Sequence, residues 1–136
     1  YTIETFNPAI HKQQWLELNN YIFAHHADQG NWAIQDLDNR MAEPWFDTSG
    51  FFLATENSVI EGFVWTKIHQ DLINQDPVGE LYVVGTHPDH AGRGIARALS
   101  VEAINYLADK GLKHAILYVD ADNEKGLKLY GSLGFN

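Results

Sequence analysis

The chain has 136 residues, a length that predicts one domain, and its 45% apolar and 20% charged residues are typical of a globular protein. It has no cysteine and no apolar run of about 18 residues, which excludes disulfides, thiolate metal sites, a cysteine nucleophile and a membrane-spanning helix. The first residues lack a basic start followed by an apolar run, so we expect no secretory signal and a cytoplasmic location.

The net charge of −9 is unevenly distributed along the chain. Residues 1–86 hold twelve acidic and three basic residues, whereas residues 87–136 hold six of each. The acidic balance argues against nucleic acid as the main partner, because phosphate binding needs clustered lysines and arginines. Two interpretations of the asymmetry stay open: an acidic, solvated face, or a cation-tolerant site early in the chain with an anion site late.

Hydrophobic periodicity, capping residues and turn residues predict the secondary structure. Asn7-Pro8 is a helix-start signal, an N-cap followed by proline at the first helical position, residues 56–58 form a turn between two strands, and Gly111 is a helix C-cap. The expected elements are, in chain order, a strand over 2–6, helices over 7–24 and 34–42, strands over 51–55, 59–69 and 80–86, a helix over 95–110, a strand over 115–119 and a helix over 123–133. An antiparallel group followed by a β-α-β-α unit indicates an α/β fold with a mixed sheet and helices on both faces. Because a helix crosses between them, the last strand should lie parallel to the strand over 80–86.

The loop before the helix over 95–110 combines glycines with arginines. Gly92 and Gly94 allow backbone amides to approach a ligand, and the loop leads into a helix whose first amides are unpaired. Arg93 and Arg97 add two cations. The combination favours a diphosphate ligand, although a glycine-rich connection without a ligand would have the same pattern. The spacing fits neither a Walker A loop nor a dinucleotide fingerprint.

The stretch from Val84 to Ala96 resembles the acetyl-CoA signature of the GNAT acyltransferase superfamily, Gln/Arg-x-x-Gly-x-Gly/Ala. Gly94 and Ala96 match that signature, whereas Ala91 stands at its Gln/Arg position. Residues 117–123 and 129–135 resemble the Asn…Tyr…Leu-Gly-Phe ending of the same superfamily. The resemblance implies the GNAT fold and an N-acetyltransferase that uses acetyl-CoA as co-substrate.

Further segments are similar to the mycothiol synthase family, in its C-terminal, catalytic half. The matching stretches are 26–32, 42–47, 63–69, 79–85 and 117–123. Those enzymes acetylate the cysteinyl amine of a cysteine–glucosamine–inositol conjugate, which the resemblance implies as the acceptor. They contain two tandem GNAT domains, and their fold continues with further strands. We therefore expect residues 1–136 to be one GNAT domain, either a fragment without its final strands or part of a tandem protein.

The resemblance also implies the site residues. Those implied for the cofactor are Val84, Gly85, Thr86, Ala91, Gly92, Arg93, Gly94, Ile95, Ala96, Arg97, Asn123, Glu124, Lys125, Gly126, Leu127 and Lys128. Those implied for the acceptor are Asp28, Lys67, Glu80 and Tyr118. In the resemblance the backbone of 84–86 pairs with the pantetheine arm, and an amide there polarises the thioester carbonyl.

Two residues are candidates for acid–base catalysis. Tyr130 resembles the general acid of the superfamily, and the alternative is a core aromatic on an amphipathic helix. Strand alternation places Glu80, Tyr82 and Val84 on one face, beside the acyl-binding position. There Glu80 would act as a base or as an anchor for the ammonium group, and the alternative is an exposed acid at a strand end.

The histidines support a rival hypothesis. His87, Asp89 and His90, together with His25, His26 and Asp28, have side chains that bind metals. No helix fixes the spacing of His87 and His90, and we expect no metal. The four tryptophans are expected to pack in the core, and Trp65 is the one that we consider as a lining residue of the acceptor site.

Three functions therefore stay open: an N-acetyltransferase, a catalytically silent CoA-binding domain, and a metal-binding module. The acidic first 86 residues favour a small cationic amine as the acceptor over an anionic one. The sequence predicts neither a membrane nor a nucleic-acid partner, and both a monomer and a homodimer are compatible with it.

Overall fold

The computed structural model describes residues 1–25, 29–69, 77–112 and 114–117, with the single residues 129, 131 and 133. Its strands form one sheet in the order β1-β2-β3-β4-β5. The strands are β1 (Thr2–Thr5), β2 (Phe51–Glu56), β3 (Val59–His69), β4 (Val78–Thr86) and β5 (His114–Leu117). The helices are α1 (Pro8–Ile22), α2 (Ile34–Met41) and α3 (Ile95–Asp109). Two short 3-10 turns, η1 (Thr48–Gly50) and η2 (Pro88–His90), precede β2 and α3. All neighbouring strands are antiparallel except β4 and β5, which are parallel as predicted.

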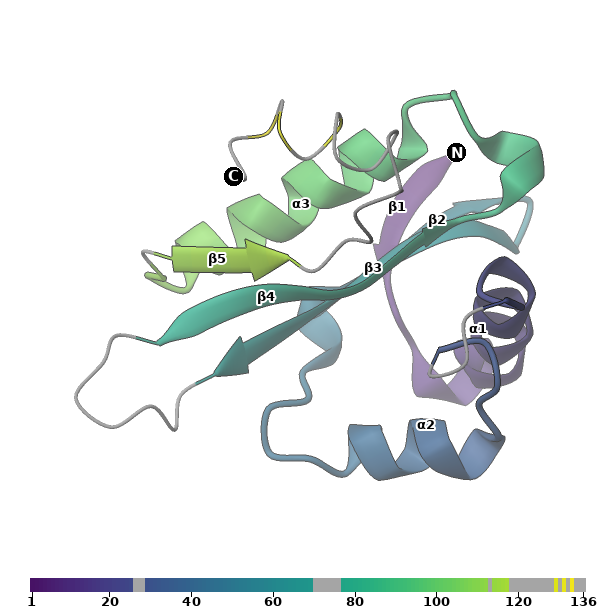
Figure 1. Cartoon of the computed structure of the whole chain (residues 1–136), viewed down its shortest axis with the longest axis horizontal. Helices are drawn as coiled ribbons and strands as arrows, with labels where there is room; N and C mark the ends of the chain where they lie inside the picture. Colours follow the sequence, from purple (N-terminus) through teal and green to yellow (C-terminus); the bar gives the residue numbers. More distant parts are fainter. Residues whose placement is uncertain are drawn as a thin grey trace.

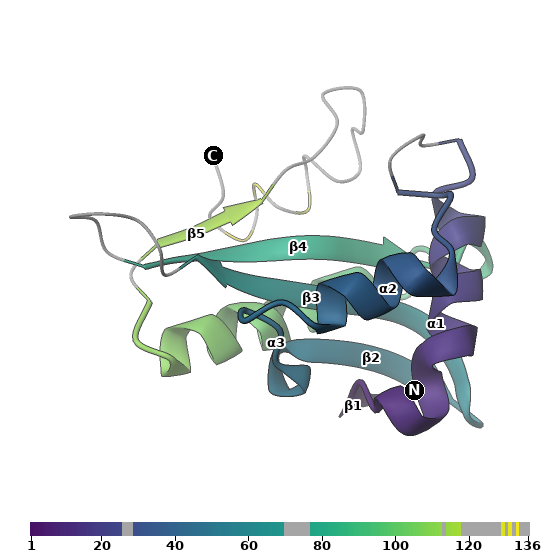
Figure 2. The same cartoon turned by 90° about the horizontal axis from the view of Figure 1, so that it is seen from below.

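Helices cover both faces of the sheet, which confirms the predicted α/β architecture (Figures 1 and 2). On the face of α1 and α2, an aromatic core surrounds Trp15, whose ring lies edge-on to Phe51, Phe63 and Trp65. On the other face, α3 buries an apolar stripe that consists of Ile95, Leu99, Ala103 and Leu107. Such edge-to-face aromatic pairs contribute roughly 0.5–1.5 kcal/mol each beyond their buried area.

The helix ends follow from local sequence. The Asn7 side chain accepts a hydrogen bond from the Ala9 amide, and Pro8 occupies the first helical position of α1, as predicted. At its other end α3 is followed by Gly111, whose φ of +80° is the left-handed conformation that glycine adopts readily. Capping residues therefore set the bounds of both helices to within two residues of the prediction.

Two bulges interrupt the sheet, and counting the alternation along each strand predicts the position of neither. The register of β3 and β4 passes from Trp65↔Val83 to Thr66↔Leu81, which leaves Tyr82 as an extra residue of β4. Tyr82 packs against the aromatic core of α1 and α2, whereas Val84 packs against the α3 side. The prediction that Val84 shares a face with Tyr82 and Glu80 is therefore wrong, because a bulge breaks the strict alternation of a strand.

Two predicted elements extend beyond the described residues. The predicted helix over 123–133 has only three positions within them, and the end of the predicted strand over 115–119 lies beyond Leu117. The described part of β5 pairs with β4 from Val78↔His114 to Leu81↔Leu117.

Candidate functional site

The glycine-rich loop connects the end of β4 to the start of α3. Gly92 and Gly94 have φ values of +83° and +79°, and a Cβ atom built on either would meet no described atom within 4 Å. Gly94 is the N-cap of α3, and since glycine has no side chain it cannot cap the first amides of the helix. Among the described residues, no side chain at the N-cap covers the first backbone amides of α3, an arrangement that binds anions such as a diphosphate.

The side chain of Arg93 is already paired within the chain. Its guanidinium lies 3.4 Å from the carboxylate of Glu61 and 3.8 Å from that of Glu56, and it contacts His90 Nδ1 at 2.8 Å. Glu61 is 3% exposed and is the extra residue of the second bulge, between β2 and β3. A buried carboxylate needs a partner, so this contact makes Arg93 a clamp on the loop, whereas the sequence analysis assigned it only as a cation for the diphosphate.

The end of β4 offers polar groups to a ligand. Beyond Leu81, the described part of β5 gives β4 no strand partner, whereas β3 pairs with β4 as far as Gly62↔Thr86. Thr86 Oγ1 is buried and has no hydrogen-bond partner among the described residues. Polar groups in such places are usually satisfied, so the segment Val84–Thr86 fits a ligand that supplies hydrogen-bonding groups along this edge.

Glu80 and Lys67 face each other at the other end of β4. They are paired in the β3–β4 register, and Glu80 is 8% exposed. One oxygen of Glu80, Oε1, lies 2.7 Å from Nε2 of His69, the last residue of β3. The structure thus brings together two of the predicted acceptor residues and adds a third side chain, His69, that the sequence analysis did not select.

Two basic side chains in this region, Lys67 and Arg40, lie over aromatic rings. The Lys67 ammonium lies over the rings of Trp45 and Tyr82, at 4.7 and 5.3 Å from their centroids. The Arg40 guanidinium lies 4.0 Å from the Trp32 centroid and donates to the Tyr82 hydroxyl at 3.2 Å. Cation–π contacts of this kind hold flexible basic side chains in place, with roughly 0.5–2 kcal/mol each.

Trp65 does not line this region, because its side chain is fully buried in the core. Its ring is stacked on Phe51 at 4.6 Å and is contacted edge-on by Tyr82. The tryptophan that lines the accessible space is Trp45, which follows α2. The expectation for Trp65 is therefore corrected: the period of a strand shows which face a residue occupies, but not how deeply it is covered.

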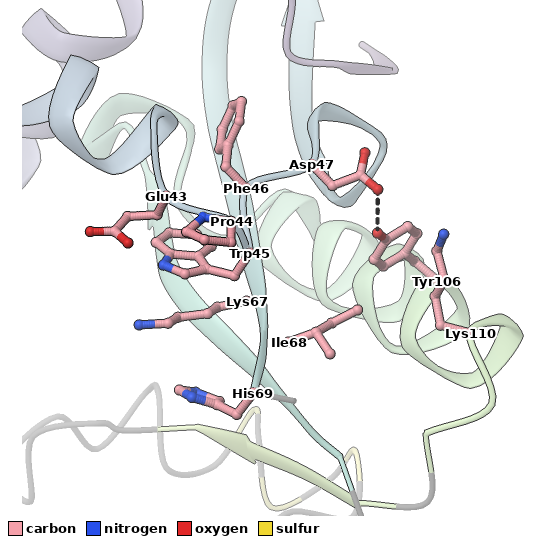
Figure 3. Close-up of a pocket in the computed structure, with 10 residues that line it drawn as sticks. All are labelled: Glu43, Pro44, Trp45, Phe46, Asp47, Lys67, Ile68, His69, Tyr106 and Lys110. Atoms are coloured by element: carbon pink, nitrogen blue, oxygen red, sulfur yellow. Dashed lines mark hydrogen bonds between the residues drawn. The ribbon is translucent and has the colours of Figure 1, made fainter. Parts of the chain in front are cut away.

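A pocket of about 650 Å³ lies between the segment after α2, the end of β3 and the last turns of α3 (Figure 3). It is lined by Glu43, Pro44, Trp45, Phe46, Asp47, Lys67, Ile68, His69, Tyr106 and Lys110. Lys67 and His69 come from its β3 wall, and the Asp47 carboxylate accepts a hydrogen bond from the Tyr106 hydroxyl at 3.4 Å. The pocket mixes acidic, basic and aromatic side chains, a lining that suits a polar molecule with hydroxyl and amino groups.

Asp47 gives the rim of this pocket a pH-dependent contribution to stability. Hydrogen bonds from the Ser49 hydroxyl and amide hold the pKa of Asp47 below its ordinary value of 3.8, with smaller contributions from Lys110 and Tyr106. A lowered folded-state pKa stabilises the fold above the ordinary value, and this contribution is lost as the pH falls through the folded pKa.

We therefore expect Asp47→Asn to lower the melting temperature near pH 7 by at most about 5 °C, because an exposed charge contributes less than about 1 kcal/mol. The deficit should disappear as the pH falls well below 3.8, where the wild-type carboxyl is protonated too. Thermal unfolding of both proteins between pH 3 and pH 7 measures this difference. A deficit that stays constant down to the lowest pH would contradict a role of the charge.

Several predicted site residues lie outside the described residues. They are Asp28, Tyr118, Tyr130 and the stretch 123–128, so their roles stay predictions. The sequence analysis did not foresee the contact between Arg40 and Tyr82, which are 42 residues apart in the sequence. Short-range periodicity carries no signal for such a contact.

The described histidines do not gather into a metal site. Within residues 1–25, 29–69, 77–112 and 114–117, no three side chains of the metal-binding types come together. His87 Nδ1 accepts from the Asp89 amide, and His90 lies against Arg93 and Glu61.

Among the same residues, no helix is both long and apolar enough to cross a membrane.

Comparison with known proteins gives the chain close relatives. The acetyltransferase (GNAT) family matches residues 13–135. A protein from Catenulispora acidiphila named mycothiol acetyltransferase is 48% identical over 134 residues, which are 98% of this chain and 43% of that protein. Another of that name, from Arthrobacter sp., is 47% identical over 135 residues, with 98% and 42% covered. The chain thus spans less than half the length of these curated relatives.

Solved structures share the fold at lower identity. The ribosomal-protein-S18-alanine N-acetyltransferase from Escherichia coli matches with a TM-score of 0.77 at 24% identity, covering 99% of this chain and 77% of that one. An aminoglycoside N-acetyltransferase solved in complex with CoA matches with a TM-score of 0.78 at 22% identity, covering 99% and 87%. These similarities extend over almost the whole chain, as expected when the order of strands and helices is the same.

Proposed function

Because the chain belongs to the acetyltransferase (GNAT) family, we propose that it is an acetyl-CoA-dependent N-acetyltransferase domain whose acceptor is a cationic aminoacyl sugar. The acceptor that fits best is the cysteinyl amine of cysteinyl-glucosaminyl-inositol. The observation that carries the acceptor proposal is 48% identity, over 98% of the chain, to a protein named mycothiol acetyltransferase.

The glycine-rich loop supports the proposed cofactor. Gly92 and Gly94 leave open space in front of the first amides of α3, where the diphosphate of acetyl-CoA would bind. Arg93, clamped by Glu61, would fix the loop, while Ala91, Ile95, Ala96 and Arg97 would contribute backbone or charge along the same surface. The predicted contacts of residues 123–128 would complete the site from outside the described residues.

The β4 edge supports the proposed position of the acyl group. On the side away from β3, the backbone groups of Val84, Gly85 and Thr86, which have no strand partner among the described residues, would hold the extended arm that links the diphosphate to the thiol. An amide in this segment would polarise the acetyl carbonyl. Acetyl-CoA itself supplies an activated acyl group, whose carbon bonds to the amine nitrogen as the carbon–sulfur bond breaks.

Glu80 and Tyr130 would handle the protons. Glu80 would anchor the ammonium group and take its proton, which leaves the amine neutral and nucleophilic. Tyr130 would protonate the departing sulfur, and the second proton released by the acylated nitrogen would restore its hydroxyl. With Asp28 and Tyr118, Lys67 would bind the polar remainder of the acceptor.

We expect Tyr130→Phe to lower kcat by about 10²-fold, because the change removes a proton donor and keeps the ring. The affinity for acetyl-CoA should be unchanged. Rapid-mixing measurements of a single turnover report the chemical step directly. Wild-type single-turnover rates in the variant would assign Tyr130 to the core.

The proposed function is tested by following thiol release from acetyl-CoA with a panel of amines of different charge. The panel contains cysteinyl-glucosaminyl-inositol, a neutral amide-capped amine, a cationic amino sugar and glutamate. We expect the conjugate to have the highest kcat/KM and glutamate the lowest, because a buried carboxylate at Glu80 repels an anionic acceptor. A preference for glutamate would overturn the acceptor proposal, and binding of CoA without turnover of any amine would favour a silent CoA-binding domain.

A further inference from the structure

His69 contacts Glu80 from a diagonal position across two strands. In the β3–β4 register His69 is opposite Val78 and Lys67 is opposite Glu80, so the imidazole reaches along the strand to the carboxylate. The contact joins His69 Nε2 to Glu80 Oε1 at 2.7 Å. His69 also lines the pocket, whereas Glu80 is almost completely covered.

The chemistry of the two groups determines the direction of this hydrogen bond. An ionised carboxylate can only accept, so Nε2 of His69 carries the proton and donates it to Oε1. Among the described residues, no donor contacts the other carboxylate oxygen, Oε2, which is therefore available for a further donor. A buried carboxylate requires a partner, because an unpaired charge is costly to remove from water.

Lys67 does not take this role. It is directly opposite Glu80 in the register, but its ammonium lies over the rings of Trp45 and Tyr82. The described hydrogen-bond partner of the carboxylate is therefore His69.

We propose that His69 is a positioning residue that holds Oε1 of Glu80 and so aims Oε2 at the ammonium group of the acceptor. The proposal rests on the proposed function, in which Glu80 receives that ammonium group. It assigns a task to a residue at the end of β3 that sequence comparison and strand pattern leave without one. A misplacement of a catalytic group by about 1 Å can cost about 10²-fold in rate, so the contact has a measurable consequence.

The kinetic test compares His69→Leu with His69→Gln. Leucine removes the donor, whereas the amide of glutamine carries an N–H at a similar distance from the backbone. We expect His69→Leu to lower kcat/KM for the amine by ten- to a hundredfold, with the KM for acetyl-CoA nearly unchanged. The melting temperature should fall as well, because the buried carboxylate loses its partner, so the kinetics are measured at a temperature where the variant is fully folded. His69→Gln should recover most of the loss. Wild-type amine kinetics in His69→Leu, or equal losses in both variants, would overturn the proposal.

A double-mutant cycle separates positioning from an independent effect. In the Glu80→Gln background, His69→Leu should cause little further loss, because the group that it positions is already disabled. Additive losses would show that His69 acts independently of Glu80 and would contradict the proposal.

The contact itself has a readout that does not need activity. In nuclear magnetic resonance spectra of the wild type, the Nε2 proton of His69 should exchange slowly with solvent, and this signal should disappear in Glu80→Ala. A missing wild-type signal would refute the contact. A wild type that shows the signal but acetylates no amine would overturn the proposed function, and with it the task given to His69, while the contact would stand.

Discussion

Gly94→Val is expected to lower the affinity for acetyl-CoA by about 10³-fold. The valine side chain would occupy the open space in front of the α3 amides, and loss of about two charge-assisted hydrogen bonds costs roughly 1.5–3 kcal/mol each. The fold should survive, since a Cβ at this position meets no described atom within 4 Å. What remains is the backbone cost of a φ of +79°, roughly 1–2 kcal/mol for a residue with a side chain.

A matched control exists at the other end of the same helix. Gly111 has a φ of +80° and equally open space around its Cβ position, so Gly111→Val has the same backbone cost away from the loop. Calorimetric titration with acetyl-CoA should therefore show lost binding in Gly94→Val and near wild-type binding in Gly111→Val. Equal affinities in the two variants, at similar melting temperatures, would contradict a diphosphate site on the loop.

Glu80→Gln is expected to lower kcat/KM for the amine by about 10³-fold, while acetyl-CoA binding stays intact. The substitution keeps the shape of the side chain and the contact with His69, but an amide neither takes a proton nor carries the charge that anchors an ammonium group. The loss combines general-base catalysis, which contributes 10²–10⁴-fold, with weaker binding of the cation.

The control for Glu80→Gln is Glu102→Gln, the same change on an exposed position of α3. Steady-state kinetics with varied amine, and calorimetry with acetyl-CoA, separate the two half-sites. If Glu80→Gln lost only acetyl-CoA binding, the carboxylate would belong to the acetyl-CoA site and not to the proposed acceptor site. Unchanged kinetics in both variants would remove Glu80 from the mechanism.

Local signals were sufficient to predict most of the fold. The Asn7-Pro8 cap, the turn between β2 and β3 and Gly111 mark element ends through interactions within a few residues, and all three are where we expected them. The parallel pairing of β4 with β5 was predictable as well, because a helix between two strands of one sheet requires a crossover.

The details of the site depend on interactions between distant residues, which the sequence does not display. The contact of Arg93 with Glu61 joins residues that are 32 apart in the sequence, and Glu61 is the extra residue of a bulge, so no local pattern displays it. The face of Val84 was mispredicted for the same reason: alternation is counted along one strand, whereas a bulge is defined by the pairing of two. His69 likewise acquires its place through cross-strand register.

The bulge at Tyr82 places beside the proposed acceptor site a residue that lies outside the regular pairing of β3 and β4. If residue 82 were deleted, Leu81 and Val83 would become neighbours, and their partners Thr66 and Trp65 are neighbours already, so the ladder would be regular. Tyr82 is thus supernumerary to the alternating pattern that builds both hydrophobic layers. The ring beneath Lys67 and the hydroxyl that receives Arg40 belong to a residue that the strand ladder does not require. We expect an aromatic residue of another size or polarity at position 82 to change the choice of amine at the proposed acceptor site while the strand ladder keeps its register.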